Sequence, residues 1–512
     1  MTPLLAFILI APLVAPLAGC GSGELEIVFL VPEGEGLSPL DEQISDVVIV
    51  RDDLGSAPQR TSHEITDRGK ALEVGAIDPG NNIRIGVELR SATQRLVGFG
   101  RSDLLDIGAG TSAAVEVHLR RPYIYVTGDT SLAAFDSAKD SGDVTFVGAV
   151  AGVTSPQQVA TSADGAEIIV VGGEVDATAL TRISTSDHAS TVGDAIPLTL
   201  PASDLVVSDD SRFALVAHSG VDGGVSVADL GGGSASFVGL GSVTRLAVTP
   251  SELGDQAFVV VDGGLDCNGP ASSIVRFSLT EGEPVGSPIT ASGPVSSVAV
   301  LADGSLAAVL PCSGQVAHFG ADGNDLGILA EVPGATAVTA SGPRAVIIGT
   351  LPPDPVAGHR PLLVSVDMAG DADSDEPGQN ESRVELPAVQ VRVSTDAFSS
   401  PGDQVSRQLD PDEVTTVDIA AVPGGDTVAM LTLSTYSADG TDLVLPSLDL
   451  EVWEYTLIDT ATGTPVQRVQ TFCDLQEGGG LVGDWQCTLA PGQAATMQTF
   501  RPLGLAALYG GK

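Results

Sequence analysis

The chain has 512 residues and a formal net charge of −43, with 66 acidic residues against 23 basic residues. This balance argues against nucleic acid as a partner, because phosphate contacts need clustered Lys and Arg, and against docking on anionic lipid through a basic face. The hydrophobic fraction of 43% argues against global disorder, while 61 glycines and 32 prolines indicate many turns and short strands.

The chain begins with an uninterrupted apolar run, LLAFILIAPLVAPLA, at residues 4–18. A run of about 15 residues is too short to cross ~30 Å of hydrocarbon comfortably. Its length is typical of the apolar region of a secretory signal, which is removed from the mature protein. We therefore expect the chain to be exported.

The residues that follow, LAGC at 17–20, resemble the lipobox of bacterial lipoproteins, in which the cysteine is lipidated and becomes the mature N-terminus. The resemblance implies a signal peptide over 1–19, lipidation of Cys20 and a short lipidated tether over 20–23. The basic residue that this family usually carries near its start is missing from Met1-Thr2-Pro3. An ordinary cleaved signal and an uncleaved anchor are the alternatives.

Residues 24–121 carry segments of alternating apolar and polar residues, which predict strands. These segments are ELEIVFLV, DVVIVRD, IRIGVELR, QRLVGFG and AAVEVHLR, and the turn clusters PEGEG, DPGNN and GAGTS lie between them. The pattern predicts a small antiparallel β-sandwich. It resembles the immunoglobulin-like or transthyretin-like modules that separate lipid anchor from head in exported proteins, which implies a stalk.

A diverged repeat occupies the rest of the chain. Six segments share an apolar run, a turn and a second apolar run, and a seventh copy, YIYVTGD, lacks the first half. The second runs begin near Tyr123, Glu167, Phe213, Ala257, Leu306, Ala345 and Val428. Five of the six intervals between these starts have the length of one four-stranded propeller blade, about 40 to 50 residues. The last interval is longer because it contains an acidic insertion near 368–414.

The C-terminal segment RPLGLAALYGGK, from Arg501, echoes RPYIYVTGD, from Arg121. We expect this segment to supply the strand that the first copy lacks, which would close the ring and leave no open sheet edge. The predicted fold is therefore all-β, with the sandwich followed by a β-propeller over 122–512. Seven blades are expected, and six or eight are the alternatives.

These repeats resemble the YVTN-type, lactonase-like β-propellers of bacterial surface and exported proteins, a WD40-like architecture. The residues that carry the resemblance are YIYVTG from Tyr123, the spaced VAxSxDG turns, and short third strands that end on Asp. The resemblance implies a propeller fold and leaves the function open.

Four cysteines remain after Cys20, and an even number in an exported chain favours disulfides. Cys473 and Cys487 flank a segment that can close as a hairpin. Cys267 and Cys312 follow equivalent strands of neighbouring repeats, so they are either a disulfide between blades or two separate buried thiols.

No catalytic signature is present in the sequence. The six histidines have no metal-ligand spacing, and GxSxG and P-loop patterns are absent, so no catalytic or metal-binding residue is assigned. His218 and His318 lie on or after blade strands and are the two histidines placed to approach the axial channel, although ordinary strand or loop positions are the favoured interpretation.

Calcium is the one candidate cofactor. Asp371, Asp373 and Asp375 alternate as the ligands of a calcium loop do. The match then fails, because Glu376 replaces the turn glycine and Ser382 replaces the last glutamate ligand. A solvated acidic loop is the favoured interpretation.

The sequence thus predicts a non-enzymatic, lipid-anchored binding or scaffold module of the cell envelope. It would recognise a protein, peptide or glycan through propeller loops, and it would sit on the outer membrane or cell surface rather than the inner membrane. One alternative is a lactonase-like hydrolytic enzyme, which would need an acid–His–Arg set over the axial channel. The other is a purely structural envelope component.

Replacing Cys20 with Ser tests the anchor. Ser cannot take the thioether-linked lipid, so the Cys20→Ser variant should move from the membrane fraction to the soluble fraction when cells are fractionated. Unchanged membrane retention would overturn the lipoprotein interpretation.

Overall fold

A computed structural model of the chain describes residues 23–32, 37–53, 59–64, 71–110, 112–128, 132–138, 146–149, 153, 155–173, 177–249, 256–262, 266–354, 358–368, 381–386, 391–394, 406–409, 413–423, 427–438, 448–460, 462–476, 484–489 and 502–507. In this part of the chain almost all regular structure is strand, and η1 (Pro39–Asp41) is a single turn of 3-10 helix. No helix among these residues is long and apolar enough to cross a membrane.

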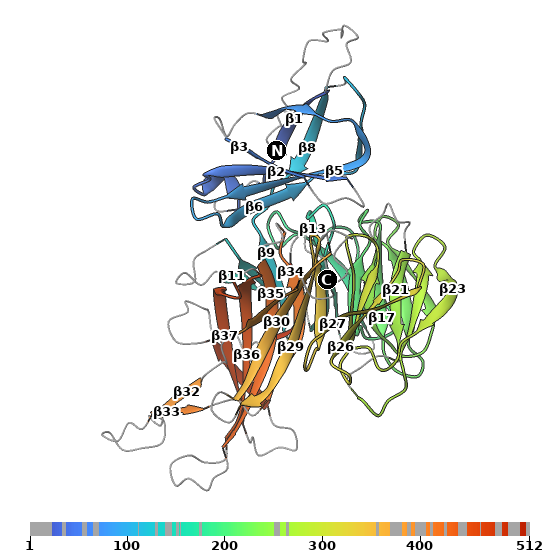
Figure 1. Ribbon diagram of the computed structural model, residues 1–512, viewed down its shortest axis with the longest axis vertical. Coiled ribbons are helices and arrows are strands. Elements are labelled where there is room, and N and C mark those ends of the chain that lie inside the picture. Colours follow the sequence, from blue (N-terminus) through green and yellow to red (C-terminus); the bar gives the residue numbers. More distant parts are fainter. Residues whose placement is uncertain are drawn as a thin grey trace.

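Two sheets form the N-terminal part, above the rest of the molecule in Figure 1. The first sheet has the order β4-β1-β8 and the second β3-β2-β5-β6, with β7 also paired to β5. Their strands are β1 (Gly23–Leu30), β2 (Asp46–Asp53), β3 (Gln59–His63), β4 (Leu72–Ile77), β5 (Gly80–Arg90), β6 (Leu96–Arg101), β7 (Leu105–Ile107) and β8 (Ala113–His118).

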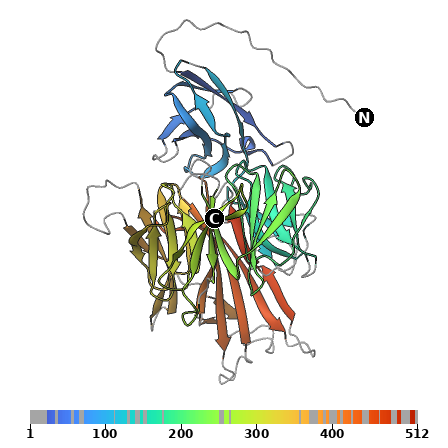
Figure 2. The same cartoon turned by 90° about the vertical axis from the view of Figure 1, so that its right-hand side faces the viewer.

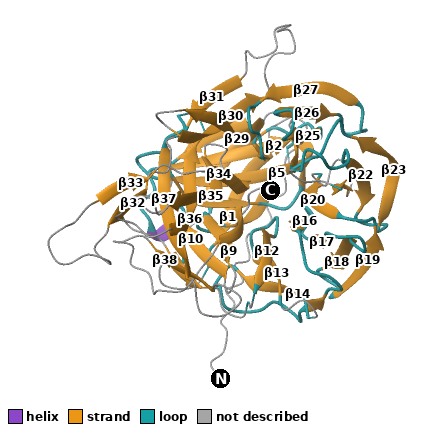
Figure 3. Ribbon diagram, turned by 90° about the horizontal axis from the view of Figure 1, so that it is seen from below, coloured by secondary structure: helices purple, strands orange, loops and turns teal. Residues whose placement is uncertain are grey.

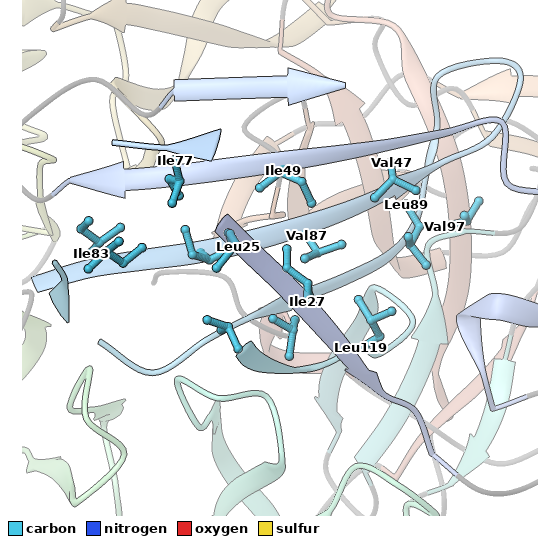
Figure 4. Close-up of a cluster of buried hydrophobic side chains, with 14 residues drawn as sticks. Leu25, Ile27, Val47, Ile49, Ile77, Ile83, Val87, Leu89, Val97 and Leu119 are labelled. Atoms are coloured by element: carbon cyan, nitrogen blue, oxygen red, sulfur yellow. The ribbon is translucent and has the colours of Figure 1, made fainter. Parts of the chain in front are cut away.

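Side chains from both of these sheets share one buried cluster (Figure 4). Leu25 and Ile27 of β1 lie in it with Val47 of β2 and Val87 of β5. Alternate residues of each strand point to the same face, so the alternating pattern of the sequence supplies this core.

All five strands expected in the N-terminal part are present, and β3, β4 and β7 were not expected. The prediction of wholly antiparallel pairing is wrong for β1 and β8, which pair in parallel with Leu25 opposite Ala113. The chain crosses to the second sheet after β1 and again after β4, and a parallel pair such as β1 and β8 requires a crossover of this kind.

Repeated antiparallel sheets follow, as in a β-propeller. Six sheets have four strands and one has five among the described residues of 123–507, and an additional two-stranded hairpin joins β32 and β33. The first has the order β11-β10-β9-β39 and contains β9 (Tyr123–Gly128), β10 (Leu132–Asp136), β11 (Phe146–Ala149) and β39 (Pro502–Ala507). The second to fourth contain β12 (Pro156–Thr161), β13 (Glu167–Gly172), β14 (Ala179–Ser184), β15 (Ile196–Pro197); β16 (Asp204–Val207), β17 (Phe213–His218), β18 (Gly224–Asp229), β19 (Ser234–Gly239); and β20 (Val243–Val248), β21 (Gln256–Val261), β22 (Ser273–Ser278), β23 (Glu283–Thr290).

The remaining sheets complete the series. They contain β24 (Ser297–Val300), β25 (Leu306–Leu310), β26 (Gln315–Phe319), β27 (Asp325–Glu331); β28 (Ala337–Ser341), β29 (Arg344–Asp354), β30 (Gly358–Asp367), β31 (Glu381–Glu385); and β34 (Glu413–Ala421), β35 (Thr427–Ala438), β36 (Leu448–Asp459), β37 (Pro465–Gln476), β38 (Asp484–Leu489). The hairpin of β32 (Val391–Ser394) and β33 (Ser406–Leu409) lies in the predicted insertion.

The seven predicted second runs are confirmed as strands. Four begin at the predicted residue, and β21, β29 and β35 begin one residue earlier. The runs are continuously apolar because each sheet buries both faces. In β13, Ile168 and Val170 lie in a cluster shared with the preceding sheet, and Ile169 and Val171 lie in a cluster shared with the following sheet.

The predicted closure by the C-terminal strand is confirmed. β39 lies antiparallel to β9, with Leu505 opposite Val126 and Ala506 opposite Tyr125. The first and last sheets also share a buried cluster, in which Phe135 stacks on Tyr455 with ring centroids 5.4 Å apart. The strands nearest the axis contact one another in a closed order (Figure 3): β39, β12, β16, β20, β24, β28 and β34. We call these the innermost strands.

Arginine side chains join the N-terminal sheets to the ring. Arg84 makes an ion pair of 2.8 Å with Asp209, and Arg101 approaches the same carboxylate at 3.4 Å. Arg120 donates from Nε to Thr185 Oγ1 at 3.2 Å. These contacts fix the N-terminal sheets to one face of the ring.

Several predicted features lie outside the described residues. The signal peptide and Cys20 are among them, and so are the three aspartates of the proposed calcium loop, while Ser382 lies in β31.

A disulfide links Cys267 with Cys312, which confirms the pairing between neighbouring repeats. Cys267 follows β21 and Cys312 follows β25, the second strands of the fourth and fifth sheets. Cys473 and Cys487 are opposite one another in the register of β37 and β38. Their disulfide stays a prediction.

Removing the Cys267–Cys312 bond should destabilise the ring, because the bond closes a sequence separation of 45 residues. The Cys267→Ser/Cys312→Ser variant should lose about 2–4 kcal/mol of unfolding free energy in urea titrations. An unchanged midpoint would contradict a stabilising role. Any remaining response of this variant to reductant would report on the Cys473–Cys487 pair.

Candidate functional site

A cavity of about 410 Å³ lies on the axis of the ring. Six consecutive innermost strands, β12 to β34, line it, each with a residue that stands directly before an apolar residue. Taken around the ring, these residues are Gln158, Asp204, Arg245, Ser297, Ala337 and Asp418. The volume is within the range of small-molecule sites.

The polar side chains at this level hold neighbouring sheets together. Those of Gln158, Asp204, Arg245 and Ser297 each reach from one innermost strand to the backbone of the next. The bonds are Gln158 Nε2 to Ser203 O (3.2 Å), Leu246 N to Asp204 Oδ2 (2.9 Å), Arg245 Nε to Ser296 O (2.9 Å) and Val338 N to Ser297 Oγ (3.1 Å). The wall of the cavity is therefore a ring of hydrogen bonds between sheets, which fixes the positions of its side chains.

The charged groups of the wall are two carboxylates and one guanidinium. Asp204 is only 6% exposed, and it accepts the backbone N–H groups of Leu205 and Leu246, both at 2.9 Å. Asp418 accepts the N–H of Ile419 at 2.9 Å. The carboxylate of Asp204 is thus engaged in holding two strands.

The cavity lies at the ring face away from the N-terminal sheets. Asp204, Ser297 and Ala337 begin their strands, whereas Ala163 and Asp209, which contact the N-terminal sheets, follow the ends of β12 and β16. We call the face at the starts of the innermost strands the cavity face.

Two sheets are extended at this cavity face. The strands β29, β30, β35, β36 and β37 have 10 to 12 residues, compared with 4 to 6 for β16 to β18. Figure 2 shows them projecting downward, away from the N-terminal sheets. Their extra residues lie beyond the starts of the innermost strands β28 and β34. The turns after β21 and β25, which carry the disulfide, lie on the same face.

The two histidines proposed to approach the axis do not line this cavity. His218 is fully buried, with Nδ1 2.9 Å from Pro201 O and Nε2 2.8 Å from Ser226 Oγ. His318 Nε2 lies 2.8 Å from Ser305 Oγ. Burial lowers the pKa of both imidazoles, so both are structural side chains that are neutral at pH 7.

His188 is a buried histidine that the sequence did not single out. It has a left-handed backbone, with φ of 54°, and its ring meets Tyr123 edge-on at 4.6 Å between centroids. Nε2 lies 3.0 Å from the Tyr125 hydroxyl. Burial lowers the pKa of His188 to about 4, an effect that nearby Asp187 only partly opposes. The imidazole is therefore neutral where the first and second sheets meet.

The residues of the cavity wall could have been found in the sequence. Most of them are polar residues that stand directly before a short apolar run, as in QVAT, DLVV, RLAV, SVAV and DIAA. What the repeat alone does not show is that this position faces the axis. Among the described residues, no three His, Cys, Asp or Glu side chains are grouped as a metal site requires.

Comparison with known proteins gives no family. No family model matches the chain, and no curated protein matches it. Among solved structures, Kuenenia stuttgartiensis hydrazine synthase aligns with a TM-score of 0.38 and 15% identity, over 56% of this chain and 78% of that chain. A nidogen/laminin complex aligns with a TM-score of 0.34 and 10% identity, over 48% of this chain and 90% of that chain. Such scores carry no argument about function.

Acidification should destabilise the protein through His188. Below pH 6.5 the unfolded chain binds a proton that the folded imidazole does not take up until about pH 4. This contribution to stability is complete above pH 6.5 and is lost as the pH falls to 4, by up to about 3 kcal/mol.

Urea titrations between pH 7 and pH 4 measure the effect. The His188→Asn variant, which tolerates the left-handed backbone, should be less stable at pH 7 but should show a flatter pH dependence. Equal pH dependence in the two proteins would show that His188 titrates normally.

Proposed function

We propose that this chain is a lipid-anchored, exported β-propeller of seven blades that binds a polar ligand at the cavity face. Each of the seven sheets is one blade in this proposal. Residues 24–121 serve as an immunoglobulin-like or transthyretin-like stalk, and Cys20 carries the lipid. The ligand is a protein, peptide or glycan segment that enters the axial cavity.

The axial cavity carries the proposal. Six consecutive innermost strands supply a polar side chain or a small one, and hydrogen bonds between sheets hold Gln158, Arg245 and Ser297 in place. Side chains fixed before binding lose little conformational entropy when a ligand arrives. The extended strands of the last two sheets add a wall with which a larger partner can make contact.

The arrangement favours binding over hydrolysis. The enzymatic alternative needs an acid, a histidine and an arginine in contact at the channel. The described lining residues include Asp204, Asp418 and Arg245, while His218 and His318 bond elsewhere. The carboxylate of Asp204 accepts hydrogen bonds from two backbone N–H groups, so it has a structural role rather than that of a general base.

The stalk and the cavity occupy opposite faces of the ring. In a chain anchored at Cys20, this arrangement points the cavity away from the membrane. A ligand that approaches from outside then meets the cavity face first.

The full chain should be screened against arrays of peptides and glycans, and the ligand that binds should then be measured with two variants at one position. Ser297→Phe fills the cavity and removes the hydroxyl that bonds Val338, whereas Ser297→Ala removes only the hydroxyl. We expect a tenfold or larger loss of affinity for Ser297→Phe and less than threefold for Ser297→Ala. Equal affinities, or no ligand on either array, would overturn binding at the cavity.

A further inference from the structure

Arg245 is held at the cavity wall with donors to spare. It lies in β20 directly after the point where the register of β20 shifts against β21. Its Nε donates to Ser296 O and its Nη1 to Thr244 O, both at 2.9 Å. These two bonds use two of the five N–H donors of a guanidinium. The remaining three lie on the two terminal nitrogens, the edge that matches a carboxylate.

The positive charge of Arg245 has no ion pair among the described residues. Ion pairs there join other arginines to carboxylates, as for Arg84 with Asp209, Arg121 with Asp136 and Arg182 with Glu167. Arg245 instead bonds to two neutral carbonyl oxygens. Nη2 of Arg245 is not among the buried polar atoms without a partner, and Arg245 is one of the residues that line the cavity.

Several other polar groups of the wall are committed to neighbouring sheets, whereas the hydroxyls of Thr244 and Thr336 are buried in the wall without a hydrogen-bond partner. Ser203 donates to Val243 O at 2.7 Å, and Ser296 donates to Thr336 O at 2.8 Å. Gln158 and Ser297 also bond to the backbone of the next sheet. Arg245 is therefore the cationic side chain that can hold an incoming group without breaking the ring of hydrogen bonds.

The charges around Arg245 limit what that group can be. Two carboxylates, Asp204 and Asp418, line the same cavity, and the chain as a whole carries −43. The positive charge of Arg245 offsets only one of these two carboxylates, so a bound monoanion adds one uncompensated negative charge. A phosphate or sulfate dianion would add two, so a singly charged group is the less disfavoured anion here.

We propose that the axial cavity binds a monocarboxylate, which accepts a bidentate pair of hydrogen bonds from the terminal nitrogens of Arg245. This inference rests on the proposed binding function and names the chemical group recognised. The rest of the ligand lies along the hydroxyl and amide side chains of the wall. About 410 Å³ accommodates a small organic acid or the end of a longer chain.

N-acetylglycylglycine and its C-terminal amide form a matched pair of probes, because they differ only in the carboxylate. We expect the full chain to bind the acid in calorimetric titrations and to bind the amide at least tenfold more weakly. The Arg245→Gln variant should bind the acid about 10- to 100-fold more weakly than the wild type, as expected when a hydrogen-bonded charge is removed.

Two further variants separate binding from folding. Arg245→Lys keeps the charge and loses the planar fork, so it should recover part of the affinity. Arg212→Gln is the control, since Arg212 lies on an exposed turn with its side chain 64% exposed, and it should bind as the wild type does. Thermal melting of each variant shows whether the ring is intact, and Arg245→Lys decides the case if Arg245→Gln does not fold.

Three outcomes would overturn the inference: equal binding of acid and amide, binding unchanged by both Arg245 substitutions, or tighter binding of inorganic phosphate than of the acid. Failure here is distinguishable from failure of the proposed function. A ligand found on the arrays and lost in Ser297→Phe would keep the binding function even if the carboxylate probe does not bind.

Discussion

The structure depends on the burial of both faces of every sheet in the ring. Each sheet shares one apolar cluster with the sheet before it and another with the sheet after it, as β13 does with Ile168 and Ile169. An open row would leave one face exposed at each end, and apolar surface left in water costs roughly 25 cal/mol per Å². The pairing of β39 with β9, and the cluster of Phe135 with Tyr455, remove both exposed faces together.

The same geometry creates the cavity. The innermost strands surround the axis in a closed order (Figure 3), and residues of six of them line the cavity there. Most of those residues are polar and bond across to the next sheet, so a single ring of side chains both joins the sheets and forms a surface. Arg245 differs because its guanidinium still has N–H donors without a partner after Nε has bonded to the next sheet.

The sequence predicts the sheets well and the cavity poorly, for physical reasons. Burial on two faces makes the second strands continuously apolar, so strand starts such as Glu167 and Phe213 can be read directly. The parallel pairing of β1 with β8 depends on how the chain crosses between sheets, which local patterning does not encode. Arg245 and Asp204 were missed because a lone polar residue before an apolar run resembles an ordinary strand start. His218 was placed near the axis because it ends a blade strand, but its ring turns into the sheet to bond Ser226.

The closing strand also sets the order in which the molecule can be completed. β9 begins at Tyr123 and its partner β39 begins at Pro502, so the ring cannot close until the segment that contains β39 has been synthesised. Contacts so distant in sequence form slowly, and an unpaired strand edge can meanwhile join another chain. The acidic character of the sequence opposes such association, because partly folded chains with a charge of −43 repel one another. High net charge therefore protects the protein during the interval in which its first sheet is still incomplete.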